Sequence, residues 1–168
     1  MALSKIDSAG IGTGAVTSTA LALGVPTRTQ MPTGSVVQVV QTSSTTQVSV
    51  AGSDVSIGLS ASITVQAGSR VLILSNYGWY NDGSGGSWTN AGTSRLFQNG
   101  SALAAFTEHN GTVTGEAAAW QNVCNYTTNA LTVGTYIFEV KHSRTIGGSH
   151  TCMRDGRMGT ITLMEILA

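Results

Sequence analysis

The chain has 168 residues, only 10% of them are charged, and the formal net charge is zero. This length suits one domain with a tail, and the charge balance excludes a basic surface for nucleic acid or anionic lipid. The sequence has no run of 18 apolar residues, and its start lacks the basic-then-apolar order of a signal peptide. We therefore expect neither membrane insertion nor export by a standard route.

Composition predicts an all-β fold. Ser and Thr make up about a quarter of the chain, Gly contributes 21 residues, and Pro occurs only twice. This mixture favours strands and tight turns over helices.

Residues 1–33 differ from the rest of the chain. Ala, Gly, Ser and Thr dominate this segment, aromatic residues are absent, and Pro26 and Pro32 lie near its end. We interpret it as an extended N-terminal attachment arm that orders on contact with a larger body. A dispensable flexible terminus is the alternative. Residues 34–168 then form the folded domain.

From Gly34 onward, short runs of β-branched and apolar residues recur at the spacing of a β-sandwich. Eight or so strands, joined by hairpins and longer crossings, predict a double-sheet jelly roll. The predicted strands are 35–41, 46–50, 56–65, 70–77, 93–98, 102–107, 112–126, 134–143 and 158–167.

Two Asn-Gly pairs indicate tight turns. Asn99-Gly100 lies between two apolar runs and predicts a two-residue hairpin, because both residues tolerate positive φ. Asn110-Gly111 repeats the signal before Thr112. The sequons at Asn99, Asn110 and Asn125 are therefore interpreted as hairpin chemistry rather than glycosylation sites.

The segment from Tyr77 to Trp88 combines large amphipathic rings and amides with several glycines. Such rings cover the apolar side of a pyranose while Asn and Asp bind its hydroxyls, so we consider a receptor-binding or glycan-binding loop. The alternative is that the rings cap one end of the sandwich. A calcium site is disfavoured because Asp82 is the loop's only carboxylate. The candidate contacts are Tyr77, Trp79, Tyr80, Asn81, Asp82 and Trp88.

Other polar residues give little support for chemistry. Cys124 and Cys152 match no metal spacing, which predicts two buried free thiols, with a disulfide as the alternative. His142, His150 and Cys152 could be drawn as a metal trio, but a fourth ligand is missing, and only a histidine repeated around an oligomer axis could hold an ion. The sequence has no nucleophile elbow, phosphate loop or recognisable carboxylate pair, so we expect no metal, cofactor or catalytic residue.

The last strand is apolar on both faces. Ile161 and Leu163 face one way, whereas Met164 and Ile166 face the other, so the strand needs two covers. One cover is the domain's own core, and the second is expected to be another copy of the protein. Strand 35–41 has the same character, with Gln38 either fixing the oligomer register or meeting solvent between copies. The candidate residues for an oligomer axis are Val36, Gln38, Val40, Ile161, Leu163, Met164 and Ile166.

The segments 1–10, 31–40 and 161–166 resemble fibre-type structural proteins of tailed phages, especially marine ones. The order of a Gly-aromatic loop, an Arg-Leu-Phe-Gln-Asn-Gly hairpin and a Tyr-Ile-Phe-Glu-Val strand is similar to their terminal jelly roll. That domain in turn resembles the tumour-necrosis-factor and complement C1q type, a trimer whose first and last strands lie near the threefold axis.

The resemblance implies a homotrimeric virion protein on the surface of a phage capsid or tail, held to other virion proteins through residues 1–33. Long tail fibres carry shafts of hundreds of residues, so the short leader favours a short fibre, a head fibre or a surface decoration. A lectin-like domain that binds host glycans is the alternative, and a secreted jelly-roll hydrolase is a third interpretation.

Overall fold

The computed structural model describes residue 28 and residues 31–81, 87–114, 119–146 and 148–168, without the side chains of 87–90, 105–114 and 146. The chain divides into two compact units, Met1–Thr33 and Gly34–Ala168. In the described part, no helix is long and apolar enough to cross a bilayer.

The second unit is built from strands. One short 3-10 turn, η2, spans Arg154–Gly156. The described strands are β1 (Val36–Ser44), β2 (Val48–Val50), β3 (Val55–Val65), β4 (Arg70–Asn81), β5 (Ser87–Gln98), β6 (Ser101–Thr114), β7 (Ala119–Thr127), β8 (Gly134–Ile146), β9 (His150–Cys152) and β10 (Gly159–Ile166).

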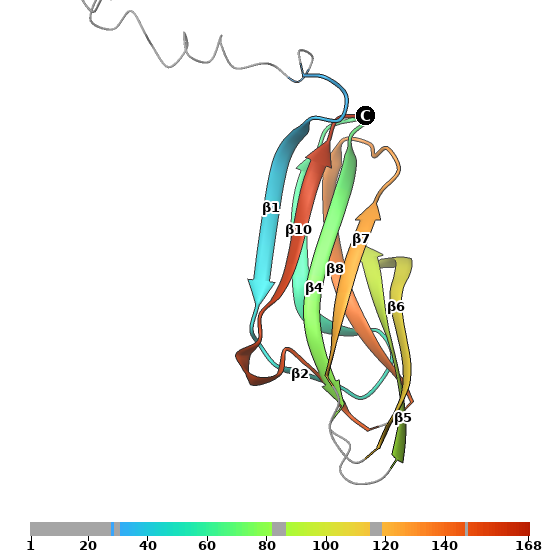
Figure 1. Ribbon diagram of the computed structural model, residues 1–168. Coiled ribbons are helices and arrows are strands. Elements are labelled where there is room, and N and C mark those ends of the chain that lie inside the picture. The colour runs from blue at the N-terminus through green and yellow to red at the C-terminus, as the bar shows by residue number, and fades with distance from the viewer. Residues whose placement is uncertain (1–27, 29–30, 82–86, 115–118, 147) are drawn as a thin grey trace, which may run out of the picture. The chain divides into compact units, whose positions relative to one another are not determined.

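These strands form two antiparallel sheets (Figure 1). In the β1–β10 sheet the order is β1-β10-β4, with β7 on the far side of β4, while β9 and β2 continue the sheet at one end of β4. In the β3–β8 sheet the order is β3-β8-β5-β6. This nesting of early strands against late ones is the connectivity of a jelly roll, so the predicted all-β jelly-roll sandwich is confirmed.

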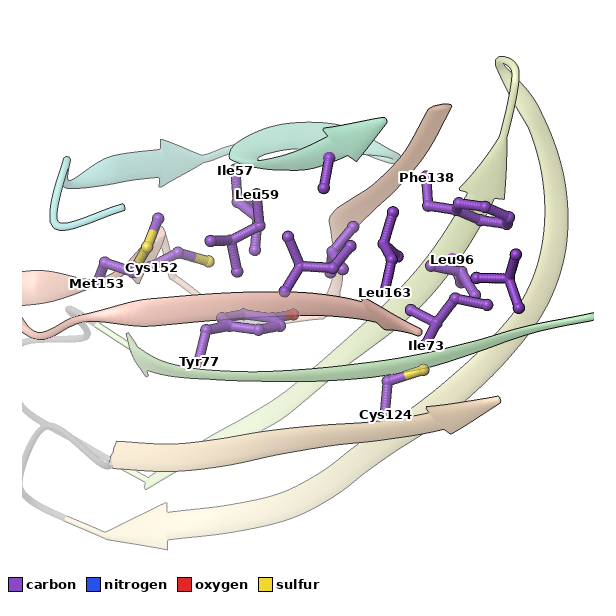
Figure 2. Close-up of a cluster of buried hydrophobic side chains, with 14 of the residues drawn as sticks. Ile57, Leu59, Ile73, Tyr77, Leu96, Cys124, Phe138, Cys152, Met153 and Leu163 are labelled. Carbon is purple, nitrogen blue, oxygen red and sulfur yellow. The ribbon is translucent and has the colours of Figure 1, made fainter. Parts of the chain in front are cut away.

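The core lies between the sheets (Figure 2). Alternation along β3 shows its origin, because Ile57, Leu59, Ala61 and Ile63 are buried while the residues that alternate with them face outward or are only partly covered. Opposite them lie side chains such as Ile73 of β4 and Leu163 of β10, both fully buried. Each such side chain contributes about 1.5–3 kcal/mol of burial free energy, so the sandwich is held chiefly by apolar packing.

The hairpin prediction at Asn99-Gly100 is confirmed. Asn99 has φ 49° and Gly100 has φ 82°, and the flanking residues Gln98 and Ser101 pair across β5 and β6. The backbone N–H of Ile137 donates to Asn99 Oδ1 at 2.9 Å, which fastens the turn to the neighbouring strand β8.

The second turn prediction is wrong. Asn110 and Gly111 lie inside β6, opposite Ala91 and Asn90 of β5. The predicted strand 112–126 is consequently divided, since its first residues belong to β6 and β7 begins at Ala119. Long-range pairing with β5 outweighs the local turn preference of the Asn-Gly pair.

The segment after Tyr77 is also strand rather than loop. β4 continues to Asn81, where its last residues pair with β7 and with β9, a three-residue strand that the sequence pattern did not predict. Between Tyr77 and Trp88, only residues 82–86 lie outside the described strands.

Candidate functional site

The face of the β1–β10 sheet that points away from the core, here called the outer face, carries an apolar row. Val39 of β1 lies opposite Met164 of β10, which in turn lies opposite Leu72 of β4. Val39 is 56% exposed, and Met164 and Leu72 are half-buried. Beside this row lie Val36, which is 50% exposed, and its partner Ile166. Apolar side chains therefore cross three adjacent strands without a cover in the single chain.

Register separates the predicted axis residues into two groups. Val36, Met164 and Ile166 belong to the outer face, where a second copy could reach them. Ile161 and Leu163 are fully buried in the chain's own core, and Val40 packs against the same core. The prediction that these three residues contact another copy is wrong, because adjacent residues of a strand point to opposite faces.

Gln38 also faces inward. It lies opposite Glu165, whose side chain is 1% exposed and accepts a hydrogen bond from the backbone N–H of Gln66 at 3.0 Å. Residues two positions apart in a strand normally share a face, but a register irregularity between Val36 and Gln38 places their side chains on opposite faces of the sheet. Gln38 is thus a polar neighbour of a buried carboxylate, which corrects its predicted place on the oligomer axis.

The structure divides the candidate glycan contacts in the same way. Tyr77 and Trp79 are fully buried and Asn81 is 2% exposed, because all three point from β4 into the sandwich. Their prediction as surface contacts is wrong, since a buried ring offers no face to a sugar. Trp79 stacks on Trp120 of β7 with ring centroids 4.4 Å apart. The buried rings therefore match the alternative interpretation, in which they cap one end of the sandwich.

The remaining candidates have different positions. Tyr80 lies on the outer face and is half-buried, with the guanidinium carbons of Arg154 and Arg157 at 5.2 and 4.9 Å from its ring centroid. Asp82 lies outside the described residues, as does the side chain of Trp88, whose backbone pairs with Val113 in β5 and β6. Tyr80 is the candidate contact that the structure places beside solvent and two cations.

A fully buried polar cluster occupies the core near this end. It consists of Tyr77, Ser94, Asn122, His142 and His150. The Tyr77 hydroxyl lies 2.9 Å from His142 Nδ1, receives a hydrogen bond from Asn122 Nδ2 at 3.0 Å, and contacts Ser94 Oγ. His142 Nε2 lies 3.0 Å from His150 Nδ1. The five side chains therefore form one connected network across both sheets.

Burial fixes the proton on the tyrosine. Removal from water raises the pKa of Tyr77 well above its ordinary value, and the nearby Cys152 raises it further. The phenol stays protonated and can donate to His142 Nδ1, in which case His142 carries its proton on Nε2 and donates to His150. The arrangement holds the strand ends together, and its full burial excludes contact with a substrate.

The two histidines of the trio considered and disfavoured as a metal site contact each other. His142 and His150 hydrogen-bond directly through their ring nitrogens. The described residues contain no group of three His, Cys, Asp or Glu side chains that could hold a metal ion. Cys124 and Cys152 are buried free thiols, as predicted.

A shallow groove of about 240 Å³ runs along the outer face between β10, β4 and β7. Its walls include Leu74, Val123 and Thr162, and Val123 is 61% exposed. Sequence reasoning missed these residues together with Val39 and Leu72. The outward alternation of Leu72 and Leu74 in β4 is the signal that could have found them.

No family model matches the chain, and no curated protein matches it. Among solved structures, a VP2 protein of infectious bursal disease virus in derived T=1 particles is similar over 80% of this chain, with 15% identity and a TM-score of 0.37. The T13 particle of the same virus gives 14% identity over 80% of this chain and a TM-score of 0.38. A CBM4 structure gives 11% identity over 70% of this chain and 77% of its own, with a TM-score of 0.22.

This chain spans 37% of the length of either viral protein.

Proposed function

We propose that this protein is a structural component of a phage virion and forms a homotrimer through the outer face of its β1–β10 sheet. Residues 1–33 attach it to other virion proteins, and the jelly roll projects from the capsid or tail surface as a short fibre, head fibre or decoration. The role is architectural, without catalysis, cofactor, nucleic acid or membrane insertion.

The observation that carries the proposal is the apolar row of Val39, Met164 and Leu72. Covering a side chain of this size with a neighbouring subunit contributes up to about 1.5–3 kcal/mol, so a few such residues from each copy support a stable oligomer. Isolated exposed apolar residues are ordinary, but a row across three strands is typical of an interface.

The chemistry of the row suits a second copy of the same chain. The row through Met164 and the next row, through Thr162, contain no charged side chain, so identical copies can meet over these two rows without like-charge repulsion. The charge on this part of the face is Arg70, which lies beyond them, opposite Ile166. The pairing of β1 with β10 also places the first and last strands together, as the resemblance to tumour-necrosis-factor and C1q domains implies.

A matched pair of variants tests the interface. Val39→Lys places a charge in the row, whereas Ile137→Lys places the same charge at a 50% exposed apolar residue of the other sheet. We expect light scattering to report monomers for Val39→Lys and wild-type trimers for Ile137→Lys. Trimers in both variants would show that the outer face does not form the interface between copies.

The arm and the location are tested on particles. A variant that lacks residues 1–33 is expected to keep its oligomeric state and to be absent from purified virions. Immunogold labelling of intact particles with an antibody to the jelly roll should place the wild-type protein on the capsid or tail surface. Unlabelled particles would contradict the virion role.

A further inference from the structure

A second groove, of about 360 Å³, lies on the outer face at the opposite end of β4 from the apolar row. Its floor is Gly78, which has no side chain and leaves a gap between Asn76 and Tyr80 on the same face. A Cβ at Gly78 would meet only the backbone oxygen of Trp120, at 3.7 Å. The volume lies within the range of about 300–1,000 Å³ that is usual for small-molecule sites.

One wall of the groove is a turn that the core holds in place. Met153 is fully buried, and its backbone N–H donates to the carbonyl oxygen of Gly78 at 2.9 Å. Met153 and Asp155 adopt positive φ angles of 52° and 58°, which non-glycine residues rarely do. Backbone strain of this kind is concentrated at ligand sites, where it holds a fixed geometry. The turn delivers Arg157 and Met158 to the rim of the groove.

Arg157 supplies a positioned positive charge. Its guanidinium lies over the Tyr80 ring at 4.9 Å, and it forms no ion pair with any carboxylate in the described residues. Arg154 lies over the same ring but pairs with Asp155 at 3.6 Å. Stacking on an aromatic ring orients a guanidinium and leaves its N–H groups available for a carboxylate.

The other wall carries two linked amides. Gln121 Nε2 donates to Asn76 Oδ1 at 2.8 Å, and both side chains are exposed. This hydrogen bond orients the pair, so the Gln121 oxygen remains an acceptor and the Asn76 nitrogen a donor. Paired donors and acceptors of this kind match the hydroxyl groups of a sugar. Met158, which is 63% exposed, adds an apolar surface at the rim.

We infer that this groove binds an acidic saccharide. The carboxylate of a uronic-acid unit binds Arg157, its hydroxyls bind the amides of Asn76 and Gln121, and the apolar side of the ring lies against Met158. This ligand class uses the charge of Arg157, the two amides and the apolar side chain of Met158 together, whereas a bare anion would use Arg157 alone. The site goes beyond the architectural role proposed above.

The groove and the apolar row proposed for assembly lie at different positions along β4. Gly78 is six residues from Leu72, which corresponds to about 20 Å along β4. The saccharide site is therefore argued from residues other than those of the apolar row.

Calorimetric titration of the full-length protein tests the inference. The probes are a glucuronate-containing oligosaccharide, its neutral glucose counterpart and inorganic sulfate. We expect the acidic oligosaccharide to bind, the neutral one to bind at least about tenfold more weakly, and sulfate not to compete at equal concentration.

Two variants and a control locate the site. Arg157→Gln should weaken binding of the acidic oligosaccharide at least about tenfold, and Gly78→Thr should abolish it by filling the floor with a residue that suits a strand. The matched control is Arg70→Gln, an exposed arginine at the far end of the same strand, which should bind like wild type. Thermal melts of each variant establish that it is folded.

Four results would overturn the inference: no binding of the acidic oligosaccharide, equal binding of the neutral one, equal competition by sulfate, or full affinity in Arg157→Gln. Light scattering on the same samples keeps the two proposals apart. A monomer that binds the saccharide contradicts the assembly alone, and a trimer that does not bind contradicts the groove alone.

Discussion

At the scale of single residues, the buried polar cluster explains why Tyr77 lies inside the sandwich despite its polar end. Its hydroxyl contacts Ser94, Asn122 and His142, so the desolvated phenol recovers the hydrogen bonds that it loses to water. A cluster of this kind aligns the strands from both sheets, because each partner must keep its register to stay satisfied.

Removing that hydroxyl should be costly. Tyr77→Phe removes one hydrogen-bond partner from each of Ser94, Asn122 and His142 inside the core, and we expect the free energy of unfolding to fall by about 1–3 kcal/mol. Tyr136→Phe is the control, since its hydroxyl bonds Thr132 in exposed surroundings and its loss should cost less than about 1 kcal/mol. Urea denaturation measures both, and equal losses would contradict a structural role for the cluster.

The two thiols predict a decline in stability at alkaline pH. Burial raises the pKa of Cys124 to about 11 and that of Cys152 to about 12, from an ordinary value of 9.0. Above about pH 9 the unfolded chain releases thiol protons that the folded chain retains. The thiol contribution is therefore complete below pH 9 and declines as pH rises toward 11 for Cys124 and 12 for Cys152.

Denaturation at pH 8 and pH 10.5, compared with a Cys124→Ala, Cys152→Ala variant, isolates this effect. The wild-type protein should lose more stability over that interval than the variant, by up to about 4 kcal/mol, because each thiol contributes about 2 kcal/mol. The same loss in both proteins would show that the thiols are not the cause.

At the scale of elements, β10 is the strand on which both the core and the outer face depend. It pairs with β1 on one side and β4 on the other, and its alternate residues supply Leu163 to the core and Met164 to the outer face. Its first residue, Gly159, is closely surrounded: a Cβ there would lie 2.8 Å from Met153 Sδ and 3.0 Å from Leu59 Cδ1.

This crowding predicts a sharp difference between two glycines. Gly159→Ala should destabilise the domain by about 1–3 kcal/mol, because the added methyl group overpacks the start of β10. Gly52→Ala should be nearly neutral, since nothing lies within 4 Å of the new methyl group. Thermal melts distinguish the two, and an unchanged melting temperature for Gly159→Ala would mean that the core adapts easily.

The elements also show how far sequence reasoning reaches. Asn99-Gly100 was predictable because the turn depends on the φ preferences of two residues. Asn110-Gly111 carries the same local signal, yet pairing with β5 keeps it extended. The strand β9 has only three residues, too few for a periodic pattern, and exists through its pairing with β4 and β2.

The candidate site was predictable in the same uneven way. An apolar last strand correctly indicated that both faces of β10 carry apolar side chains, but assigning residues to each face required the register. Ile161 and Leu163 therefore moved from the expected axis into the core. The prediction of surface contacts in the aromatic segment was wrong for another reason. The Gly-rich run beyond Tyr80 has the composition of a loop, and this concealed the inward alternation of Tyr77 and Trp79. Arg157 gave no sequence signal, since its position depends on the turn after β9.

At the scale of the whole molecule, the jelly roll satisfies one face of the β1–β10 sheet with its own core and leaves the other face apolar at one end and polar at the other. The apolar end is the surface proposed for assembly, and the polar end contains the groove at Gly78. The deletion of Ile161 to Ala168 should remove both the central strand and the interface, so no folded oligomer is expected.

The most direct test of this account is the molar mass of the full-length protein by light scattering at micromolar concentration. We expect three times the mass of one chain, stable on dilution through that range. A mass of one chain, with the sandwich still folded by circular dichroism, would contradict assembly through the outer face.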